Sequence, residues 1–163
     1  MRLRIAAMGD AEAITNVINT AFRRAESFFI ERDRIDQDGV RDFLQTGEFL
    51  VAEDGGELAG CVYLERRGDR AYIGLLAVDP SRQGAGLGSR LMVAAEDRCR
   101  DLGCHAANLQ IVNLRQELPD FYRRRGYMPT GTAPFRPDLV TKMPCYFIKM
   151  SKPLTDGSYQ GKS

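Results

Sequence analysis

The chain has 163 residues, with 23 Lys or Arg against 22 Asp or Glu, so its formal charge nearly cancels. A chain of this length is typical of one domain that buries roughly 68–70% of its unfolded surface. The balanced charge argues against a general attraction to nucleic acid or to an anionic membrane. No apolar stretch approaches a bilayer span, and the first residues do not read as a signal peptide. We therefore expect a cytoplasmic protein with neither nucleic acid nor a membrane as partner.

In the first part of the chain, the pattern predicts a strand over residues 3–6 and an amphipathic helix over 11–25, with Asp10 as its N-cap. A second amphipathic segment follows near residues 40–44. Two strands, 48–52 and 58–64, flank a glycine-containing turn, which is typical of a hairpin.

In the second part, the apolar run at residues 71–78 predicts a central strand. The elements expected after it are a helix over 87–102, a strand over 105–112, a helix over 118–125, a strand starting at Tyr127, a long Pro-rich loop over 129–144 and a last strand over 145–150. Mixed ordering with hairpins predicts the α+β class. We expect one domain over residues 1–150 and a polar, disordered tail over 151–163.

The four cysteines, Cys61, Cys99, Cys104 and Cys145, match no CxxC pattern typical of a metal or redox site. The chain's single histidine, His105, lies beside one of them and adds little support for a metal. We expect buried or half-buried free thiols in a reducing compartment, and no metal.

The most informative segment runs from Arg82 to Arg90 and reads RQGAGLGSR. Its alternate glycines lie where the loop after a strand enters a helix. A helix N-terminus exposes unpaired backbone N–H groups and the positive end of the helix dipole. Because glycine has no side chain, a phosphate group can approach such a backbone closely. The segment therefore predicts a site for a phosphorylated ligand.

Two classes of phosphate ligand fit this segment poorly. A nucleoside triphosphate loop needs Gly-Lys-Ser/Thr, whereas Gly88-Ser89-Arg90 has no lysine. A dinucleotide fingerprint needs a glycine or alanine at the place of Ser89 and a doubly wound sheet, which the element order does not supply.

Coenzyme A is the third class, and here the chain resembles a known family. The run Gln83-Gly84-Ala85-Gly86-Leu87-Gly88 is similar to the Gln/Arg-x-x-Gly-x-Gly/Ala motif of the GNAT acetyltransferase superfamily. Leu76-Ala77-Val78-Asp79-Pro80 resembles the strand-to-loop signature that precedes that motif. Downstream, FYRRRGY at residues 121–127 resembles the family's Tyr-x-x-x-Gly-Phe/Tyr helix end. The two motifs occur in the family's order, and the resemblance covers about residues 2–150.

The resemblance implies a GNAT fold, in which a mixed, mostly antiparallel sheet splays apart at the strand before the glycine loop and about four helices flank it. Acetyl-CoA would be the co-substrate. Its pantetheine amides would pair with the strand end and its diphosphate would rest on N–H groups of the loop. The cofactor-binding residues so implied are Leu76, Ala77, Val78, Gln83, Gly84, Ala85, Gly86, Leu87, Gly88 and Ser89.

The implied reaction is acyl transfer from a thioester to an amine. Tyr122 matches the tyrosine that often protonates the departing thiolate in this family, and a phenol with an ordinary pKa of about 10 stays protonated at neutral pH. The Val78 N–H would stabilise the oxyanion. The general base stays open: the strand at 71–76 has no carboxylate, and Glu65, Asp79 and His105 are weak candidates.

Acceptor binding is expected between residues 22–35 and 129–144. Phe28 and Phe29 would either form aromatic walls that suit a cationic amine, together with a carboxylate, or belong to the core. The carboxylates Glu26, Glu31 and Asp33 are individually interpreted as a solvated face. The family often has an asparagine seven residues before the tyrosine, where this chain has Arg115. Arg123, Arg124 and Arg125 are interpreted as a solvated surface. The acceptor would be a small-molecule or protein amine, and homodimerisation through the C-terminal strands follows from family habit.

Two other functions remain open at this stage. One is a catalytically silent CoA sensor or partner-binding module, suggested by the absent strand carboxylate and by Arg115. The other, weaker, is a dinucleotide-dependent oxidoreductase. Acceptor-dependent release of free thiol from acetyl-CoA would separate the enzyme from the module.

Overall fold

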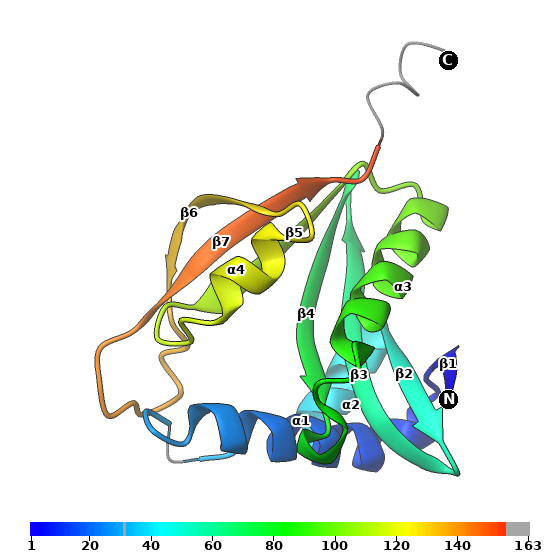
Figure 1. Ribbon diagram of the computed structural model, residues 1–163, viewed down its shortest axis with the longest axis horizontal. Coiled ribbons are helices and arrows are strands. Elements are labelled where there is room, and N and C mark those ends of the chain that lie inside the picture. The colour runs from blue at the N-terminus through cyan, green and yellow to red at the C-terminus, as the bar shows by residue number, and fades with distance from the viewer. Residues whose placement is uncertain (31, 156–163) are drawn as a thin grey trace.

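The computed structural model describes residues 1–30 and 32–155. Within them, a seven-stranded sheet has the order β1-β2-β3-β4-β5-β7-β6, and its one parallel pair is β4 with β5 (Figure 1). This mixed sheet with flanking helices is the α+β arrangement expected from the sequence. The elements are β1 (Arg2–Ile5), α1 (Ala11–Glu26), α2 (Gln37–Thr46), β2 (Glu48–Asp54), β3 (Glu57–Arg67), β4 (Arg70–Val78), α3 (Leu87–Asp101), β5 (Ala106–Val112), α4 (Leu118–Arg123), β6 (Met128–Pro134) and β7 (Tyr146–Pro153), with 3-10 turns at Met8–Asp10 and Pro80–Arg82.

Strands β2 and β3 are buried on both faces, and alternate residues point to opposite layers of helices. Phe49 and Tyr63 pack against α1, whereas Leu50 and Leu64 pack with α3. This follows from the two-residue side-chain period of a strand. Helices α1 and α2 therefore cover one face, and α3 and α4 cover the other (Figure 1).

The parallel pair β4–β5 separates soon after it begins. Pairing runs only from Arg70 opposite Ala106 to Tyr72 opposite Asn108. Further along β4, the register against β3 shifts between Cys61 and Tyr63, and Leu75 has a positive φ of 51°. A bulge of this kind bends a strand. The splay expected at the strand before the glycine loop is thus present, and Figure 1 shows β4 and β5 diverging below their common upper end.

The C-terminal region differs from the sequence-based expectation in two respects. Residues 128–134 form strand β6, where we expected the start of a loop. Because β6 is the outermost strand, a proline in it can lack the N–H that would face outward without losing a ladder bond. Strand β7 continues to Pro153, where we expected the tail, because Ser151–Pro153 pair with β5. The rest of the expected tail, 156–163, lies outside the described residues.

Asp10 takes the N-cap position of α1, as expected, but its carboxylate does not cap that helix. It accepts from the Ala7 N–H and from Arg4, both at 2.8 Å. Cys61, Cys99 and Cys104 are buried and Cys145 is half-buried, in agreement with the expected packing of the thiols. Burial raises the pKa of Cys61 to about 12. No helix within residues 1–30 and 32–155 is long and apolar enough to cross a membrane.

Candidate active site

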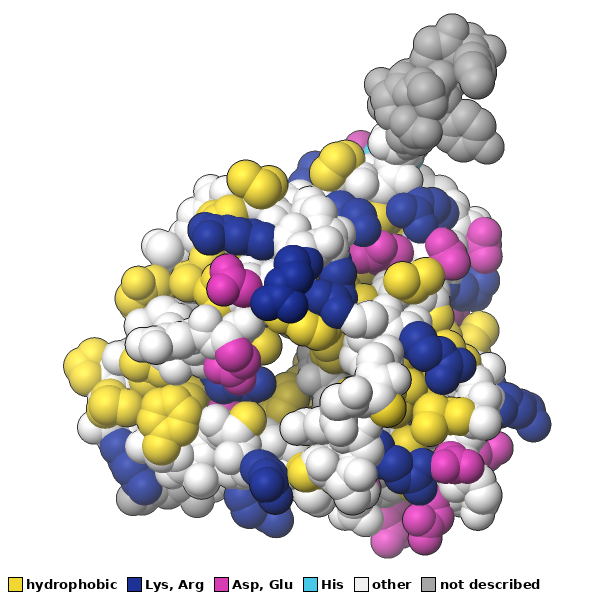
Figure 2. Space-filling model, in the orientation of Figure 1, with side chains coloured by type: hydrophobic (Ala, Val, Ile, Leu, Met, Phe, Trp, Pro, Cys, Tyr) yellow, Lys and Arg dark blue, Asp and Glu magenta, His cyan; other side chains and the backbone are white. Residues whose placement is uncertain are grey.

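A cleft of about 1460 Å³ lies where β4 and β5 part. Figure 2 shows the opening between the two halves of the molecule. One end of the cleft is lined by the glycine loop and α4. The other end is lined by α1, the α1–α2 linker and the β6–β7 loop. Because β5 has left β4, the strand edge inside the cleft is open to a ligand.

The glycine loop ends at an uncapped helix. Gly84 and Gly86 have positive φ angles of 91° and 77°, which a residue with a side chain adopts only at a cost. Gly86 is the N-cap of α3, and no side chain accepts from the first turn. The first N–H groups of α3 are therefore available to an anion from outside the helix.

Gly88 supports the same interpretation for a different reason. Its φ is not positive, and a Cβ added there would meet Phe121 only at an ordinary contact distance of 3.6 Å. Neither backbone geometry nor packing therefore demands glycine at this position. Gly88 lines the cleft, so a ligand that approaches the backbone there accounts for the missing side chain. The loop fits the diphosphate of CoA on these grounds.

The end of β4 supplies a second set of backbone donors. Val78 lies opposite Gly60, and the next pair is hydrogen-bonded because the Asp79 N–H donates to Ala59 O at 2.8 Å. In an antiparallel ladder such pairs alternate, so the Val78 N–H points away from β3, toward the gap. By the same alternation the backbone of Ala77 faces β3.

Most of the cofactor residues expected from the sequence come together in the cleft, and Ala77 and Ala85 are the exceptions. The side chain of Gln83 donates to Val78 O at 3.3 Å, which ties the loop back to the strand. Arg82 forms an ion pair with Asp54 on the β2–β3 hairpin. In this structure Arg82 therefore braces the loop.

Tyr122 lines the cleft from α4 and is only 7% exposed. Its ring packs edge-on against Phe121 and Tyr127, with centroids 5.0 and 5.8 Å away. Burial raises the pKa of Tyr122 to about 12, since a phenolate would be poorly solvated there. The hydroxyl thus keeps its proton at any physiological pH and is available as a hydrogen-bond donor.

Arg125 was expected to be solvated, and this was wrong. Its guanidinium lies 3.6 Å from the centroid of Phe121 and donates to Ser89 Oγ and to Phe121 O. Its Nε is enclosed with no partner among the described residues. Burial and the neighbouring Arg124 lower the pKa of Arg125. Arg125 lies in the turn after α4, and the run of three arginines could not show which of them packs inward there.

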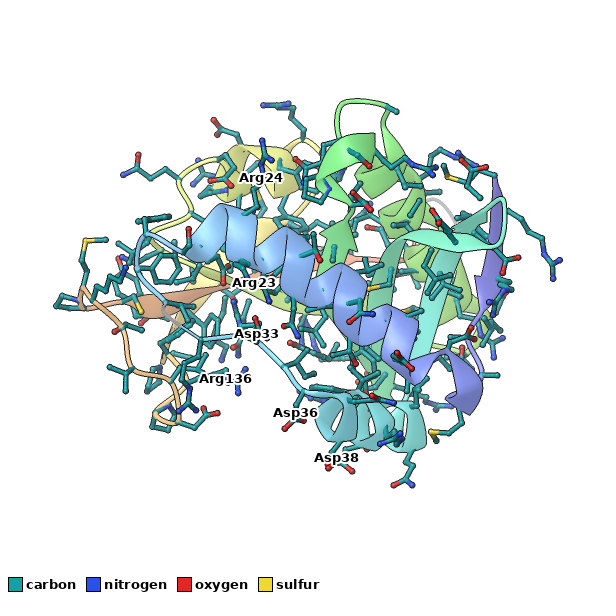
Figure 3. All side chains as sticks on the ribbon, turned by 90° about the horizontal axis from the view of Figure 1, so that it is seen from below. Arg23, Arg24, Asp33, Asp36, Asp38 and Arg136 are labelled. Carbon is teal, nitrogen blue, oxygen red and sulfur yellow. The ribbon has the colours of Figure 1, made fainter. Side chains whose placement is uncertain are left out.

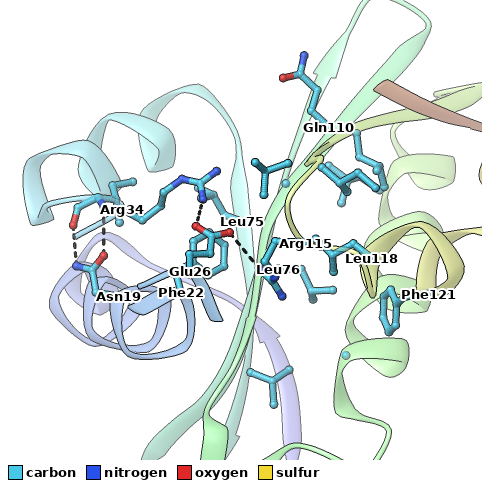
Figure 4. Close-up of a pocket in the computed structure, with 18 of the residues that line it drawn as sticks. Asn19, Phe22, Glu26, Arg34, Leu75, Leu76, Gln110, Arg115, Leu118 and Phe121 are labelled. Atoms are coloured by element: carbon cyan, nitrogen blue, oxygen red, sulfur yellow. Dashed lines mark hydrogen bonds and ion pairs between the residues drawn. The ribbon is translucent and has the colours of Figure 1, made fainter. Parts of the chain in front are cut away.

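The end of the cleft where the acceptor is expected, called here the acceptor end, contains an ion cluster that the sequence did not reveal. Glu26 at the end of α1 pairs with Arg34 from the α1–α2 linker and, at 3.1 Å, with Arg115 from the loop after β5 (Figure 4). Glu26 is 4% exposed. Arg115 occupies the place of the family's asparagine, and here its partner is a carboxylate 89 positions away in the chain.

Around this cluster, the mouth of the cleft has exposed charges of both signs. Asp33 pairs with Arg23, and Arg136 pairs with Asp138. Figure 3 shows Asp33, Asp36 and Arg136 on the underside, near the α1–α2 linker and the start of α2. Both segments expected to bind the acceptor, residues 22–35 and 129–144, contribute to the lining. Glu31, in the first of them, lies outside the described residues.

The two phenylalanines of the first acceptor segment differ in environment. Phe29 is core, in a small cluster with Val112 and Phe135. Phe28 is 50% exposed, and neither ring lines the cleft as an aromatic wall.

None of the three weak candidates for a base lines the cleft. Glu65 accepts from Tyr63 at 2.6 Å and pairs with Arg67. Asp79 accepts from the Ser81 N–H, which lowers its pKa. His105 is exposed at the start of β5. Glu65 and Asp79 are engaged by neighbouring residues, and His105 faces solvent outside the cleft. The base is therefore not identified among these three side chains.

Comparison with known proteins agrees with this geometry. Residues 11–127 match the model of the acetyltransferase (GNAT) family. The chain belongs to the GNAT family. Members of this family use acetyl-CoA, and the fold expected from the sequence is confirmed.

Individual GNAT relatives are similar over part or all of the chain. A blasticidin-S acetyltransferase of Streptomyces morookaense is 37% identical over 87 residues, which are 53% of this chain and 62% of that protein. An IAA acetyltransferase of Azospirillum brasilense is 28% identical over 65% of this chain and 67% of that protein. The match to the blasticidin-S enzyme thus spans less than two thirds of its length.

Solved structures share the fold at low identity. The yncA protein of Salmonella typhimurium, solved with its cofactor acetyl-CoA, has a TM-score of 0.74 at 24% identity, covering 96% of this chain and 95% of that one. The ribosomal-protein-S18-alanine N-acetyltransferase of Escherichia coli has a TM-score of 0.76 at 17% identity, with 96% of each chain covered.

Proposed function

We propose that this GNAT protein is an N-acetyltransferase that transfers an acetyl group from acetyl-CoA to a primary amine by direct attack. The observation that carries the proposal is that one continuous cleft joins an uncapped glycine loop to a separate, side-chain-lined pocket, and that Tyr122 lines this cleft from α4. A cleft of this form suits two substrates that meet at its middle. We extend the proposal to action in the cytoplasm without a metal.

Different backbone segments would bind different parts of the co-substrate. The N–H groups at the start of α3 and the loop from Gln83 to Ser89 would hold the diphosphate, because bare helix N-termini favour anions. The open edge of β4 at Leu76 would pair with the pantetheine amides as an added strand does, and Val78 would contact the thioester end of the co-substrate. Acetyl-CoA supplies an acetyl group activated as a thioester.

Two donors serve the reacting atoms in this proposal. The Val78 N–H, pointing into the gap, would hydrogen-bond the carbonyl oxygen as negative charge develops on it. The Tyr122 hydroxyl would donate its proton to sulfur as the carbon–sulfur bond breaks, leaving neutral CoA thiol, and the phenolate would regain a proton from water. The amine loses its proton to solvent, because the base candidates from the sequence lie outside the cleft.

The test is acceptor-dependent thiol release from acetyl-CoA across a panel of amines, with mass spectrometry of the products. We expect thiol release that matches the N-acetylated product one to one. CoA binding without acceptor-dependent thiol release would contradict the proposal and favour the silent CoA-binding module. The presence of Tyr122 in the cleft speaks for the enzyme.

The acceptor would be a small molecule or a protein amine. Self-association through the C-terminal strands is also part of the proposal, although β6 at the sheet edge has prolines at both 129 and 134, which hinder strand pairing.

A further inference from the structure

The charges at the acceptor end lie at two depths. Asp33 and Asp138 on the rim have side chains 51% and 60% exposed. Arg34, Glu26 and Arg115 lie deeper, with side chains 11%, 5% and 16% exposed. Water and salt screen exposed charges far more than buried ones. The deep cluster therefore decides which charge the pocket favours in an acceptor.

Glu26 is not available to hold a cationic acceptor. Its Oε1 accepts from Arg34 Nη1, and its Oε2 accepts from Arg115 Nη1. Both carboxylate oxygens are therefore engaged by guanidinium groups. A polyamine placed here would have to displace an arginine from a buried carboxylate, which leaves a buried charge unpaired.

The two guanidinium groups, in contrast, keep donors to spare. A guanidinium has five N–H donors and no acceptor. Among residues 1–30 and 32–155, the side chain of Arg34 donates only through Nη1, and that of Arg115 only through Nη1 and Nε. Both side chains line the cleft. A ligand group that matches these free N–H donors is one that only accepts hydrogen bonds.

The guanidinium of Arg34 is also held in a fixed plane. It lies 5.0 Å from the centroid of Phe22 and 5.4 Å from that of Phe135. Figure 4 shows Arg34 and Arg115 on opposite sides of Glu26, close to Leu75 and Leu76 on the splayed strand. A fixed planar fork matches a planar carboxylate in a bidentate manner.

We propose that the acceptor is an amine that itself carries a carboxylate, as an amino acid does, and that Arg34 and Arg115 bind this carboxylate. The inference rests on the proposed acetyltransferase function. Glu26 is a positioning residue that holds the two guanidinium groups apart and aims their free edges into the cleft. The amine then lies toward β4, where the thioester would be.

The first experiment compares matched acceptors. Thiol release from acetyl-CoA is measured with the α-amino acids, with their α-amides, and with spermidine. An α-amide loses its ammonium proton at lower pH than the amino acid, so intrinsic reactivity favours the amide and makes the comparison stringent. We expect kcat/KM for the best amino acid to exceed that of its amide at least about tenfold, which corresponds to about 1.4 kcal/mol.

The second experiment does not depend on turnover. Calorimetry on the CoA-saturated protein measures binding of the N-acetyl amino acids and of their amides. The variants are Arg34→Gln and Arg34→Lys, with Arg41→Gln as a matched control, since Arg41 forms an exposed ion pair on α2. We expect Arg34→Gln to abolish the preference for carboxylates, Arg34→Lys to retain part of it, and Arg41→Gln to leave it unchanged. If Arg34→Gln does not fold, the test uses Arg34→Lys with an unchanged Tm, in which we expect a reduced preference for carboxylates.

Two outcomes overturn the inference. One is that no carboxylate is preferred over its amide in either assay. The other is that the preference for carboxylates is as large in folded Arg34→Gln or Arg34→Lys as in wild type. If amides or spermidine are acetylated and amino acids are not, the inference of an amino-acid acceptor is contradicted but the acetyltransferase proposal stands. If carboxylates bind in an Arg34-dependent manner but no amine gives thiol release, the carboxylate site stands and the proposed acetyltransferase reaction is contradicted.

Discussion

The two ends of the cleft are built by different means. At the cofactor end, one continuous segment from Gln83 to Ser89 presents backbone N–H groups, and its glycines keep the surface bare. At the acceptor end, side chains from α1, the α1–α2 linker and the loop after β5 meet around Glu26. A backbone site serves a constant ligand, whereas a side-chain site is free to change its specificity. Substitutions at one end should therefore leave binding at the other intact.

Tyr122→Phe tests the reacting centre, where the two substrates would meet, and has the largest expected effect. Removing the hydroxyl removes the donor to the leaving sulfur, and general-acid contributions typically reach at least about 100-fold. We expect kcat to fall about 100-fold, with the CoA dissociation constant unchanged within about twofold. Tyr146→Phe is the control, because Tyr146 is 45% exposed. An unchanged kcat would remove the acid role of Tyr122.

Gly88→Val tests the cofactor end. The side chain would fill the space beside the loop backbone and keep a diphosphate away from the N–H groups. We expect CoA affinity to fall at least about tenfold, or about 1.4 kcal/mol, in isothermal calorimetry.

Gly131→Ala is the control for this loop variant, since an added Cβ there meets nothing within 4 Å. Gly88→Ala repeats the test with a Cβ that packs without strain against Phe121. If Gly88→Val bound CoA as tightly as wild type, the ligand would not approach this backbone.

Glu26→Gln tests the acceptor end and should change CoA binding least. The amide keeps the shape but loses the charge that pairs with Arg34 and Arg115, so Arg34 loses its carboxylate partner and Arg115 keeps only Glu117. We expect a lower Tm and a higher acceptor KM, with CoA affinity within about twofold of wild type. A loss of CoA affinity as large as in Gly88→Val would show that the two ends are not independent.

The smallest expected effect is on the pH profile. Burial raises the pKa of Tyr122 from its ordinary value of 10.0 to about 12, so the folded protein favours the protonated phenol. The stabilisation this gives is complete below pH 10 and is lost as the pH rises through about 12. Between about pH 6 and 9, wild type and Tyr122→Phe should show kcat profiles of the same shape. A basic limb in that range, present only in wild type, would contradict the assigned pKa.

The glycine loop could be predicted from the sequence because its determinants are local. The run of glycines between a strand and a helix is read directly from adjacent residues, and the structure brings Gly84, Gly86 and Gly88 to the cleft as that pattern indicates. The position of Ala77 outside the cleft lining could not be predicted, since the bulge at Leu75 fixes which backbone groups face the gap, and no residue type signals that bulge.

The acceptor end could not be predicted in the same way. Glu26 and Arg115 are 89 positions apart, and only the splay of β4 and β5 brings them together. A single signal was present: Arg115 replaces the family's asparagine, and a buried arginine needs a carboxylate. Which carboxylate pairs with Arg115 depends on where the fold places the end of α1 relative to the loop after β5, and the local pattern does not encode that placement.

Calorimetry with CoA and with pantetheine, which lacks the diphosphate and the 3′-phosphoadenosine attached to it, tests the central claim most directly. If backbone N–H groups from Gln83 to Ser89 hold the diphosphate, CoA should bind one to one with saturable heat, and pantetheine at least about 100-fold more weakly, or about 2.7 kcal/mol. Equal affinity for the two molecules, or no heat with CoA on well-folded protein, would contradict the account.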